Sequence, residues 1–402
     1  MTTMTTTPKL GRDWRLLWTA STISTLGDGA FLAVLPLLAA SITTDPRLIA
    51  GVTAWGTLPW LLASLPAGAL VDRTDARRSM LTVQGAQAVL VAILATLTMM
   101  HAAQMAVIYA IAFALGVAET VAKVASQKLI PAVVPSELLE KANGRQNASL
   151  FTAKEFLGPP IGALLFSFAA ALPLWVDVAS FAISAALVAR LAVRTRPTVR
   201  NGRSMRADIA EGVRWLSRHR LLRTLTLLSG AANLANYIAL STLVLFARDR
   251  LGLSDVGYGI LVGLMAVGGI AGSLLSQRIV KRFGGRAVAT TTIFATPIAL
   301  LCIAFLARDL ASMAALATVT SFGASLWNVA ASSLRQRTVP SELIGRVSSA
   351  GMLVSWGVQP IGAVLGGLIA ASPLGLVGPW IVAGLIRLIA ALSALRALRE
   401  WP

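Results

Sequence analysis

Long apolar stretches alternate with short polar ones along the whole chain. Each stretch holds about twenty mostly apolar residues, which is the length that an α-helix needs to cross a bilayer. Twelve such stretches can be counted, at 16–42, 48–71, 79–100, 104–130, 145–170, 173–193, 222–246, 256–279, 287–306, 310–333, 347–371 and 376–396. This pattern predicts an all-α membrane protein with twelve transmembrane helices.

The composition indicates the same class of protein. The 402-residue chain is 56% hydrophobic and 13% charged, whereas soluble domains are about 25% charged. The formal net charge of +18 raises the question of nucleic acid, but a nucleic-acid-binding protein gathers Lys and Arg on a solvated face. Here they lie in the loops between apolar stretches, so we expect no nucleic-acid partner.

The basic residues are concentrated in alternate loops. They precede the first stretch, follow the second, surround the junction of the fourth and fifth, and fill 190–223; the same alternation continues to the C-terminal end. The other set of loops contains only Arg47, Arg248, Arg250 and Arg308. Because cytoplasmic loops carry the excess of Lys and Arg, we expect a multi-pass protein of the cell membrane with both termini in the cytoplasm.

The chain contains an internal repeat. VPSEL at 134–138 returns at 339–343, and each copy leads into a stretch that contains PIGA, at 160–163 and 360–363. The first copy is longer between the two motifs than the second. We therefore predict an N-terminal six-helix bundle (1–193), a basic cytoplasmic linker (194–221) and a C-terminal six-helix bundle (222–402). Within the linker, Ile209, Val213 and Leu216 have the spacing of a short amphipathic helix on the membrane surface.

No cofactor site is evident in the sequence. Cys302 is the single cysteine, and His101 and His219 are far apart with no further ligand cluster, so a metal centre is not expected. No nucleotide-binding P-loop is present. We expect no cofactor and no enzymatic activity.

Two motifs resemble those of a known family. GALVDRTDARR at 68–78 resembles the signature between helices 2 and 3 of the major facilitator superfamily, and the resemblance extends over nearly the whole chain. The VPSEL segments and EGVRWLSRHRLLRTL at 211–225 are similar to the branch of enterobactin-exporter-like and macrolide-efflux-like permeases. FLGPPIG at 156–162, with Gly158, Pro159 and Gly162, resembles the helix-5 Gly-Pro signature of exporters that act as antiporters.

The resemblance implies a conformational latch at 68–78, made of Gly68, Asp72, Arg73, Arg77 and Arg78. Asp72 is expected near the start of the eleventh helix, where free backbone N–H groups and the helix dipole favour a carboxylate. The arginines are expected to pair with neighbouring acids when the cytoplasmic side is closed. The alternative is a solvated loop whose arginines only set the topology.

Charged residues inside the apolar stretches are the first candidates for coupling or substrate recognition. A charge at the bilayer centre costs about 2.5–3.5 kcal/mol on insertion scales, so it usually faces a cavity or a partner. The candidates are Asp28, Glu119, Lys123, Lys154 and Glu155. The family arrangement implies that their three helices line one side of a central cavity, where the three acids and two lysines leave one carboxylate in excess.

Structural roles remain open for several of these groups. Glu119 with Lys123 or Lys154 can equally be a fixed ion pair. Asp28 has no basic partner on its own helix, and Ala112 stands where drug–proton antiporters carry a helix-4 arginine, so Asp28 is the leading candidate. Asp177, near the end of a helix expected to be peripheral, indicates a structural role. For Arg387, midway along the last stretch, the sequence offers no account.

The C-terminal half carries amides and aromatic rings instead of charges. The candidates that line its side of the cavity are Asn233, Asn236, Tyr237, Trp327, Asn328, Trp356 and Gln359. Such groups suit a large amphipathic ligand that needs a few directed hydrogen bonds, although bonding between helices is an alternative for each.

The sequence as a whole favours a secondary transporter that exports a small amphipathic compound, such as a drug, antibiotic or siderophore, by alternating access. We expect coupling to a proton and a monomer in the lipid bilayer. The alternatives are an importer of a nutrient or metal chelate with the same fold, and a membrane scaffold or sensor that transports nothing.

Overall fold

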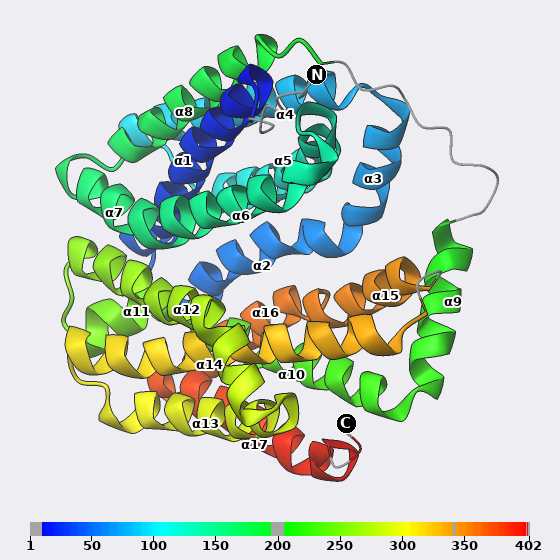
Figure 1. The fold of residues 1–402 in the computed structure, drawn as a ribbon. Coiled ribbons are helices and arrows are strands. Elements are labelled where there is room, and N and C mark those ends of the chain that lie inside the picture. Colours follow the sequence, from blue (N-terminus) through cyan, green and yellow to red (C-terminus); the bar gives the residue numbers. More distant parts are fainter. Residues whose placement is uncertain (1–9, 194–204, 341–342, 399, 401–402) are drawn as a thin grey trace, which may run out of the picture.

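The fold is shown by a computed structural model that describes residues 10–193, 205–340, 343–398 and 400; the side chains at 64, 65, 68, 69, 72, 205–209 and 345 also lie outside this description. Every regular element in the described residues is helical (Figure 1). Nine of these helices are long and apolar enough to cross a membrane, and a tenth span results if the bent pair Arg220–Leu240 and Leu243–Arg250 is taken as one.

The N-terminal half runs from α1 to α8. Its elements are α1 (Arg12–Ile42), α2 (Pro46–Leu62), α3 (Ser64–Arg73), α4 (Ala76–Met99), α5 (Met105–Val133), η1 (Ser136–Leu138), α6 (Leu139–Ser149), η2 (Leu150–Leu157), α7 (Gly158–Phe168) and α8 (Leu172–Ala189).

The C-terminal half runs from α10 to α17 and is preceded by α9. The elements are α9 (Met205–Arg218), α10 (Arg220–Leu240), α11 (Leu243–Leu245), η3 (Phe246–Arg250), α12 (Asp255–Phe283), α13 (Gly285–Leu306), α14 (Leu310–Thr338), α15 (Ile344–Trp356), α16 (Gln359–Ala370), η4 (Gly375–Val377) and α17 (Gly378–Leu398).

Several of the twelve predicted helices are built from consecutive pieces, among them 222–246 (α10, α11 and η3) and 347–371 (α15 and α16). The second predicted helix, 48–71, is divided into α2 and α3 at Ala63, shortly after Pro59. The fifth, 145–170, consists of α6, the π-helix η2 and α7. Since a proline lacks a backbone N–H and clashes with the preceding turn, Pro159 and Pro160 end the regular hydrogen bonding, and a π-helical segment accommodates the mismatch.

The two halves lie against each other as separate groups of helices, α1–α8 above and α10–α17 below in Figure 1. They are joined where α7 packs on α12 and where α2 packs on α16. Gly259 of α12 makes the first contact close, since a Cβ there would lie 2.7 Å from the Pro159 carbonyl oxygen. Gly367 of α16 does the same against Ala50 of α2. Small residues of this kind let membrane helices approach. We call this the packed end.

The opposite end of the molecule carries α3 and α9, and we call it the linker end (Figure 1). Helix α9 lies within the predicted linker and packs on α15, where Glu211 accepts a hydrogen bond from Arg346 Nη1 at 2.8 Å. Leu216 is buried and Val213 is exposed; the side chain of Ile209 lies outside the described residues. The helix therefore bridges to the C-terminal half through both ionic and apolar contacts.

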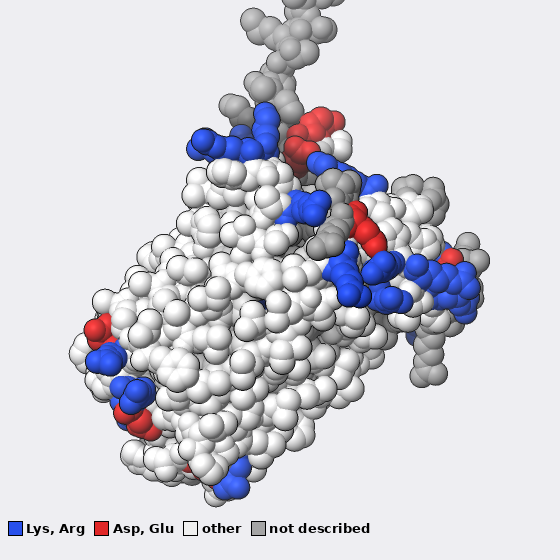
Figure 2. Space-filling model, turned by 90° about the horizontal axis from the view of Figure 1, so that it is seen from below, with Lys and Arg blue, Asp and Glu red and all other residues white. Residues whose placement is uncertain are grey.

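The surface is that of a membrane protein. Large apolar side chains are widely exposed, among them Phe168, Leu274 and Ile389. Figure 2 shows Lys and Arg gathered toward the two ends of one face, more of them at one end, with a broad uncharged band between. A soluble monomer rarely exposes so large an apolar area, so this band matches the hydrocarbon layer of a bilayer.

Polar side chains cap the helices where they leave that band. Asp309 begins α14 with a capping box, in which its carboxylate accepts from the backbone N–H of Ser312 at 2.8 Å. These hydrogen bonds lower the pKa of Asp309 from its ordinary value, because they favour the charged carboxylate. The cap fixes where α14 starts.

Candidate functional site

The five charged candidates of the N-terminal half lie around one cavity. The cavity has a volume of about 530 Å³, and its wall includes Asp28, Glu119, Lys123, Lys154 and Glu155. Asp28 comes from α1, Glu119 and Lys123 from α5, and Lys154 and Glu155 from the π-helix η2. The structure therefore brings together charges that are up to 127 positions apart in the sequence.

Glu119 and Lys154 form an ion pair across two helices. Lys154 Nζ donates to Glu119 Oε1 at 2.6 Å. The lysine side chain is 16% exposed and the glutamate 42% exposed, so the lysine is held in the protein while the carboxylate faces the cavity. Of the two lysines available to Glu119 in the sequence, the structure pairs it with Lys154.

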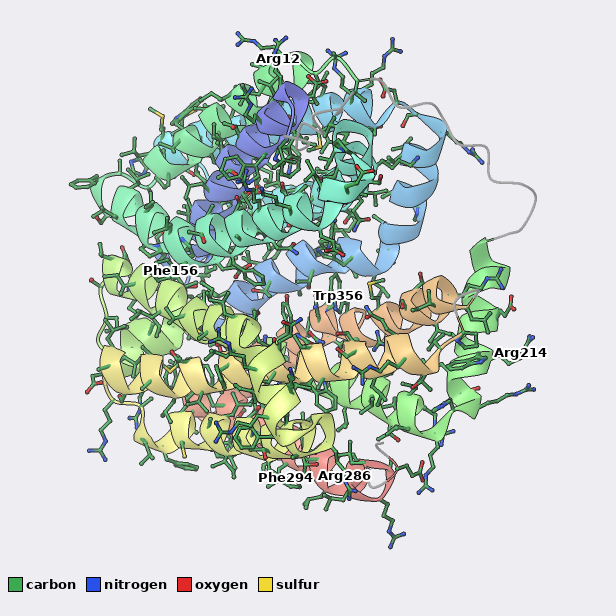
Figure 3. All side chains as sticks on the ribbon, in the orientation of Figure 1. Arg12, Phe156, Arg214, Arg286, Phe294 and Trp356 are labelled. Carbon is green, nitrogen blue, oxygen red and sulfur yellow. The ribbon has the colours of Figure 1, made fainter. Side chains whose placement is uncertain are left out.

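Lys123 lies between two tryptophans from opposite halves of the molecule. Its Nζ is 4.6 Å from the ring centroid of Trp60 and 4.8 Å from that of Trp356. The two indoles meet edge to face, with centroids 5.4 Å apart and planes at 77°. Figure 3 places Trp356 between the upper and lower groups of helices. The ammonium therefore stabilises a contact between α2 and α15 through cation–π attraction.

Asp177 is a sixth charged residue of the same cavity. It is 1% exposed, and its Oδ1 accepts from the Ser180 hydroxyl at 3.1 Å. Helix α8 reaches α1 here because Gly27 has no side chain; a Cβ at Gly27 would collide with Asp177 and Ser180. The family arrangement led us to expect Asp177 on a peripheral helix, whereas the small residues Gly27 and Ser180 allow the close approach that brings it to the cavity.

The helix-5 Gly-Pro segment lies between α1 and the C-terminal half. Gly158 and Gly162 pack directly on the backbone of α1 at Gly29 and Ala30. On its other side, the carbonyl of Pro159 faces Gly259 of α12, and Phe156 is seen between the two groups of helices in Figure 3. A movement of this segment therefore alters packing contacts in both halves.

A second cavity, of about 520 Å³, lies in the C-terminal half. Its wall includes the predicted residues Asn233, Asn236, Tyr237, Trp327 and Asn328, whereas Trp356 and Gln359 line the first cavity instead. Leu32, Thr53, Glu155 and Tyr237 line both cavities. The two spaces therefore adjoin across the interface between the halves.

Some of these polar groups bond to neighbouring helices and others do not. Asn233 Nδ2 donates to the Ser229 carbonyl at 2.9 Å, and Trp327 Nε1 donates to the Ser229 hydroxyl at 3.2 Å. Gln359 Nε2 donates to Asn233 Oδ1 at 3.5 Å. Within the described part of the chain, the side chains of Asn236, Tyr237 and Asn328 make no hydrogen bond, so they are the ones available to a ligand.

The expected latch is described only in part. The side chains at positions 68 and 72 lie outside the described residues, as do Ser341 and Glu342 of the second VPSEL copy. Arg77 donates through Nε to the Val188 carbonyl at 3.2 Å and through Nη2 to the Ala189 carbonyl. Arg73 and Arg78 are exposed. In this conformation Arg77 binds the C-terminal end of α8, inside its own half.

A helical membrane bundle with adjoining cavities between two halves is the architecture of a secondary transporter. A family model described as the Major Facilitator Superfamily matches residues 17–358 and 225–400. The chain belongs to this superfamily, whose members are membrane transporters and not enzymes.

Two relatives are pumps. The chain is 26% identical over 362 residues to the multidrug efflux pump Tap of Mycolicibacterium fortuitum, covering 86% of each chain. It is 25% identical over 409 residues to Tap of Mycobacterium tuberculosis, covering 96% of this chain and 95% of the relative.

Solved structures share the fold at lower identity. A bacterial homologue of the iron transporter ferroportin in an inward-facing state gives a TM-score of 0.72 at 18% identity, over 98% of this chain and 99% of that one. The nucleoside transporter NupG gives 0.74 at 13% identity, over 98% and 100%. These neighbours show the architecture alone.

Proposed function

We propose that this protein exports small amphipathic organic compounds and that it couples export to protons through the carboxylates of the N-terminal cavity. The observation that carries the proposal is the presence of Asp28 and Asp177 in one cavity whose lysine Lys154 is already paired with Glu119.

The charge balance of the cavity supports proton coupling. Four carboxylates and two ammonium groups line it: Asp28, Glu119, Glu155, Asp177, Lys123 and Lys154. Carboxylates at membrane depth are costly unless neutralised, and the two lysines leave two of them uncompensated. A proton or a cationic substrate supplies the missing charge, which makes the binding of one dependent on the other.

The direction of transport is supported by relatives and by one motif. Both relatives reported above are named multidrug efflux pumps. The helix-5 Gly-Pro segment resembles that of exporters acting as antiporters, and it packs against both halves, where it can affect the change of conformation. The C-terminal cavity combines aromatic and aliphatic side chains with amides and hydroxyls, a lining that suits an amphipathic ligand.

The decisive test uses everted membrane vesicles from cells that lack their own pumps. With the chain expressed, an imposed proton gradient should drive uptake of ethidium, an amphipathic cation, into the vesicles. Asp28→Asn should abolish this uptake while leaving downhill ethidium exchange intact, and Asp28→Glu should keep part of it with a shifted pH profile.

Asp249→Asn is the matched control, since Asp249 is an exposed carboxylate outside both cavities. It should behave as the unmodified protein. Gradient-driven uptake that persists fully in Asp28→Asn would refute the coupling role. Ethidium uptake by right-side-out vesicles, with none by everted ones, would instead make the protein an importer.

A further inference from the structure

Arg387 is a charged residue of the C-terminal cavity for which neither the sequence nor the proposed coupling supplies a role. It lies on α17 and forms part of the cavity wall. Its Nε is buried and has no hydrogen-bond partner, and within the described residues Arg387 forms no ion pair. Glu155, the acid among the residues that line this cavity, is not bonded to it either.

An unpaired guanidinium in this position is unusual. An arginine keeps its charge under all relevant conditions, and a charged group inside a membrane is normally paired or faces a water-filled cavity. A role limited to holding helices together would use its donors on carbonyls or acids of the neighbouring helices. The buried Nε of Arg387 has no protein acceptor among the described residues and the side chain forms part of the cavity wall, so the fixed positive charge is available to a molecule that enters the cavity.

The rest of the cavity wall suits an organic molecule more than a small inorganic anion. Tyr258, Val262, Met265 and Trp327 contribute aromatic and aliphatic surface. Asn236 and Asn328 are the unbonded amides already described. A planar carboxylate matches the forked donors of a guanidinium in a bidentate manner, whereas an apolar body fills the remaining volume.

We propose that Arg387 anchors the carboxylate of a transported amphipath. This inference deepens the proposed function by naming the substrate class: amphipathic carboxylates, including zwitterions. The two cavities adjoin at Glu155 and Tyr237, so a zwitterion can place its anionic group at Arg387 and its cationic group near the acids of the N-terminal half. Each of the two cavities, at about 520 and 530 Å³, lies within the range of drug-sized sites.

The test is an equilibrium binding measurement that needs no gradient, so it stands or falls separately from the export proposal. Two probes differ in one group: rhodamine 110 carries a free carboxylate, and rhodamine 123 is its methyl ester. Binding is followed by fluorescence anisotropy in nanodiscs of uncharged lipid. Arg387→Met should lower the affinity for rhodamine 110 by about tenfold or more, because a charge-assisted bidentate contact is lost. It should change the affinity for rhodamine 123 by less than about threefold.

Two variants frame this result. Arg387→Lys should recover part of the rhodamine 110 affinity, since lysine keeps the charge and loses the fork. Arg286→Met removes an equal charge from the exposed start of α13, visible in Figure 3, and should leave both probes unchanged. If Arg387→Met lowers the affinity for both dyes equally, or for neither, the proposal is overturned.

A competition on the unmodified protein keeps the proposal testable if Arg387→Met does not fold. 2-Naphthoate should displace rhodamine 110 at concentrations about tenfold lower than 2-naphthamide, its neutral analogue. Equal potency of the two would overturn the anchor. Phosphatidylglycerol added to the nanodiscs distinguishes the other source of an anion: if it abolishes rhodamine 110 binding, Arg387 holds a lipid headgroup and the substrate assignment is wrong.

Discussion

Replacing Trp356 with leucine should shift the protein away from the conformation described here. Trp356 and Trp60 belong to different halves, and Lys123 lies within cation–π distance of both. This contact holds the halves in one relative position. Because it is made by residues of opposite halves, a conformation that moves the halves apart at this point loses it.

The structure sets the size of the effect. Trp356→Leu removes one cation–π contact, worth about 0.5–2 kcal/mol depending on desolvation, and one edge-to-face pair, worth about 0.5–1.5 kcal/mol. The sum is roughly 1–3.5 kcal/mol, which corresponds to a change of roughly 5- to 300-fold in the ratio of the two conformations at about 1.4 kcal/mol per tenfold.

Spin-label distances measure this ratio directly. Cys302 is first replaced by serine, since it is the single cysteine, and labels are attached at Leu48 and Leu374, which are exposed on opposite halves near the packed end. In the Trp356→Leu background the population with the longer distance should grow by the stated factor.

Trp55→Leu is the matched control for this experiment. Trp55 packs on Tyr109 and Phe113 inside the N-terminal half. Its replacement by leucine therefore also removes one indole, but leaves the contact of Lys123, Trp60 and Trp356 intact. If the two variants give the same distance distribution, Lys123 and its two tryptophans do not bias the conformation, and the reasoning fails.

Three further predictions follow from the cavity, the topology and the latch. Asp177→Asn should reduce proton-driven ethidium uptake as Asp28→Asn does, because both carboxylates face one cavity; unaltered pH-dependent uptake would return Asp177 to a purely structural role. A reporter that is active only outside the cytoplasm, fused after Pro402, should give no signal, and a strong signal would reverse the topology. Asp72→Asn should slow transport and leave the equilibrium affinity for ethidium nearly unchanged, as measured by uptake rate and binding side by side; a loss of affinity alone would exclude the latch.

The sequence predicted the helical membrane fold because apolar length is a strong and local signal. It could not predict the interruptions at Ala63 and in η2, since a proline in an apolar stretch is compatible with a kink, a break or a π-helical turn. The partner of Glu119 illustrates a second limit. Lys123 is favourably spaced on the same helix, but Lys154 comes closer only because η2 presents it toward α5.

The candidates missed by the sequence depended on distant contacts. Asp177 reaches the cavity because α8 approaches Gly27, a contact between positions 150 apart in the chain. The isolated state of Arg387 is likewise a property of the folded bundle, since the absence of an acid beside it in the sequence says nothing about the helices packed around it. For the same reason the sequence could not predict that Asn233 of α10 is hydrogen-bonded to neighbouring groups whereas the Asn236 side chain is not.

The π-helix η2 gives the charged cavity an unusual dependence on chain length. Its wider turn stores extra residues within an otherwise helical segment, and the longer spacing between VPSEL and PIGA in the first copy of the repeat falls in this region. One α-helical residue corresponds to a rotation of about 100°, so deleting a single residue upstream of Lys154 would turn its ammonium away from Glu119 while the Gly-Pro segment stays against α1. Deleting one residue would therefore separate the Lys154–Glu119 ion pair without replacing any side chain. The corresponding described segment of the second copy, α15 and α16, contains no π-helix, so the same deletion there has no equivalent effect.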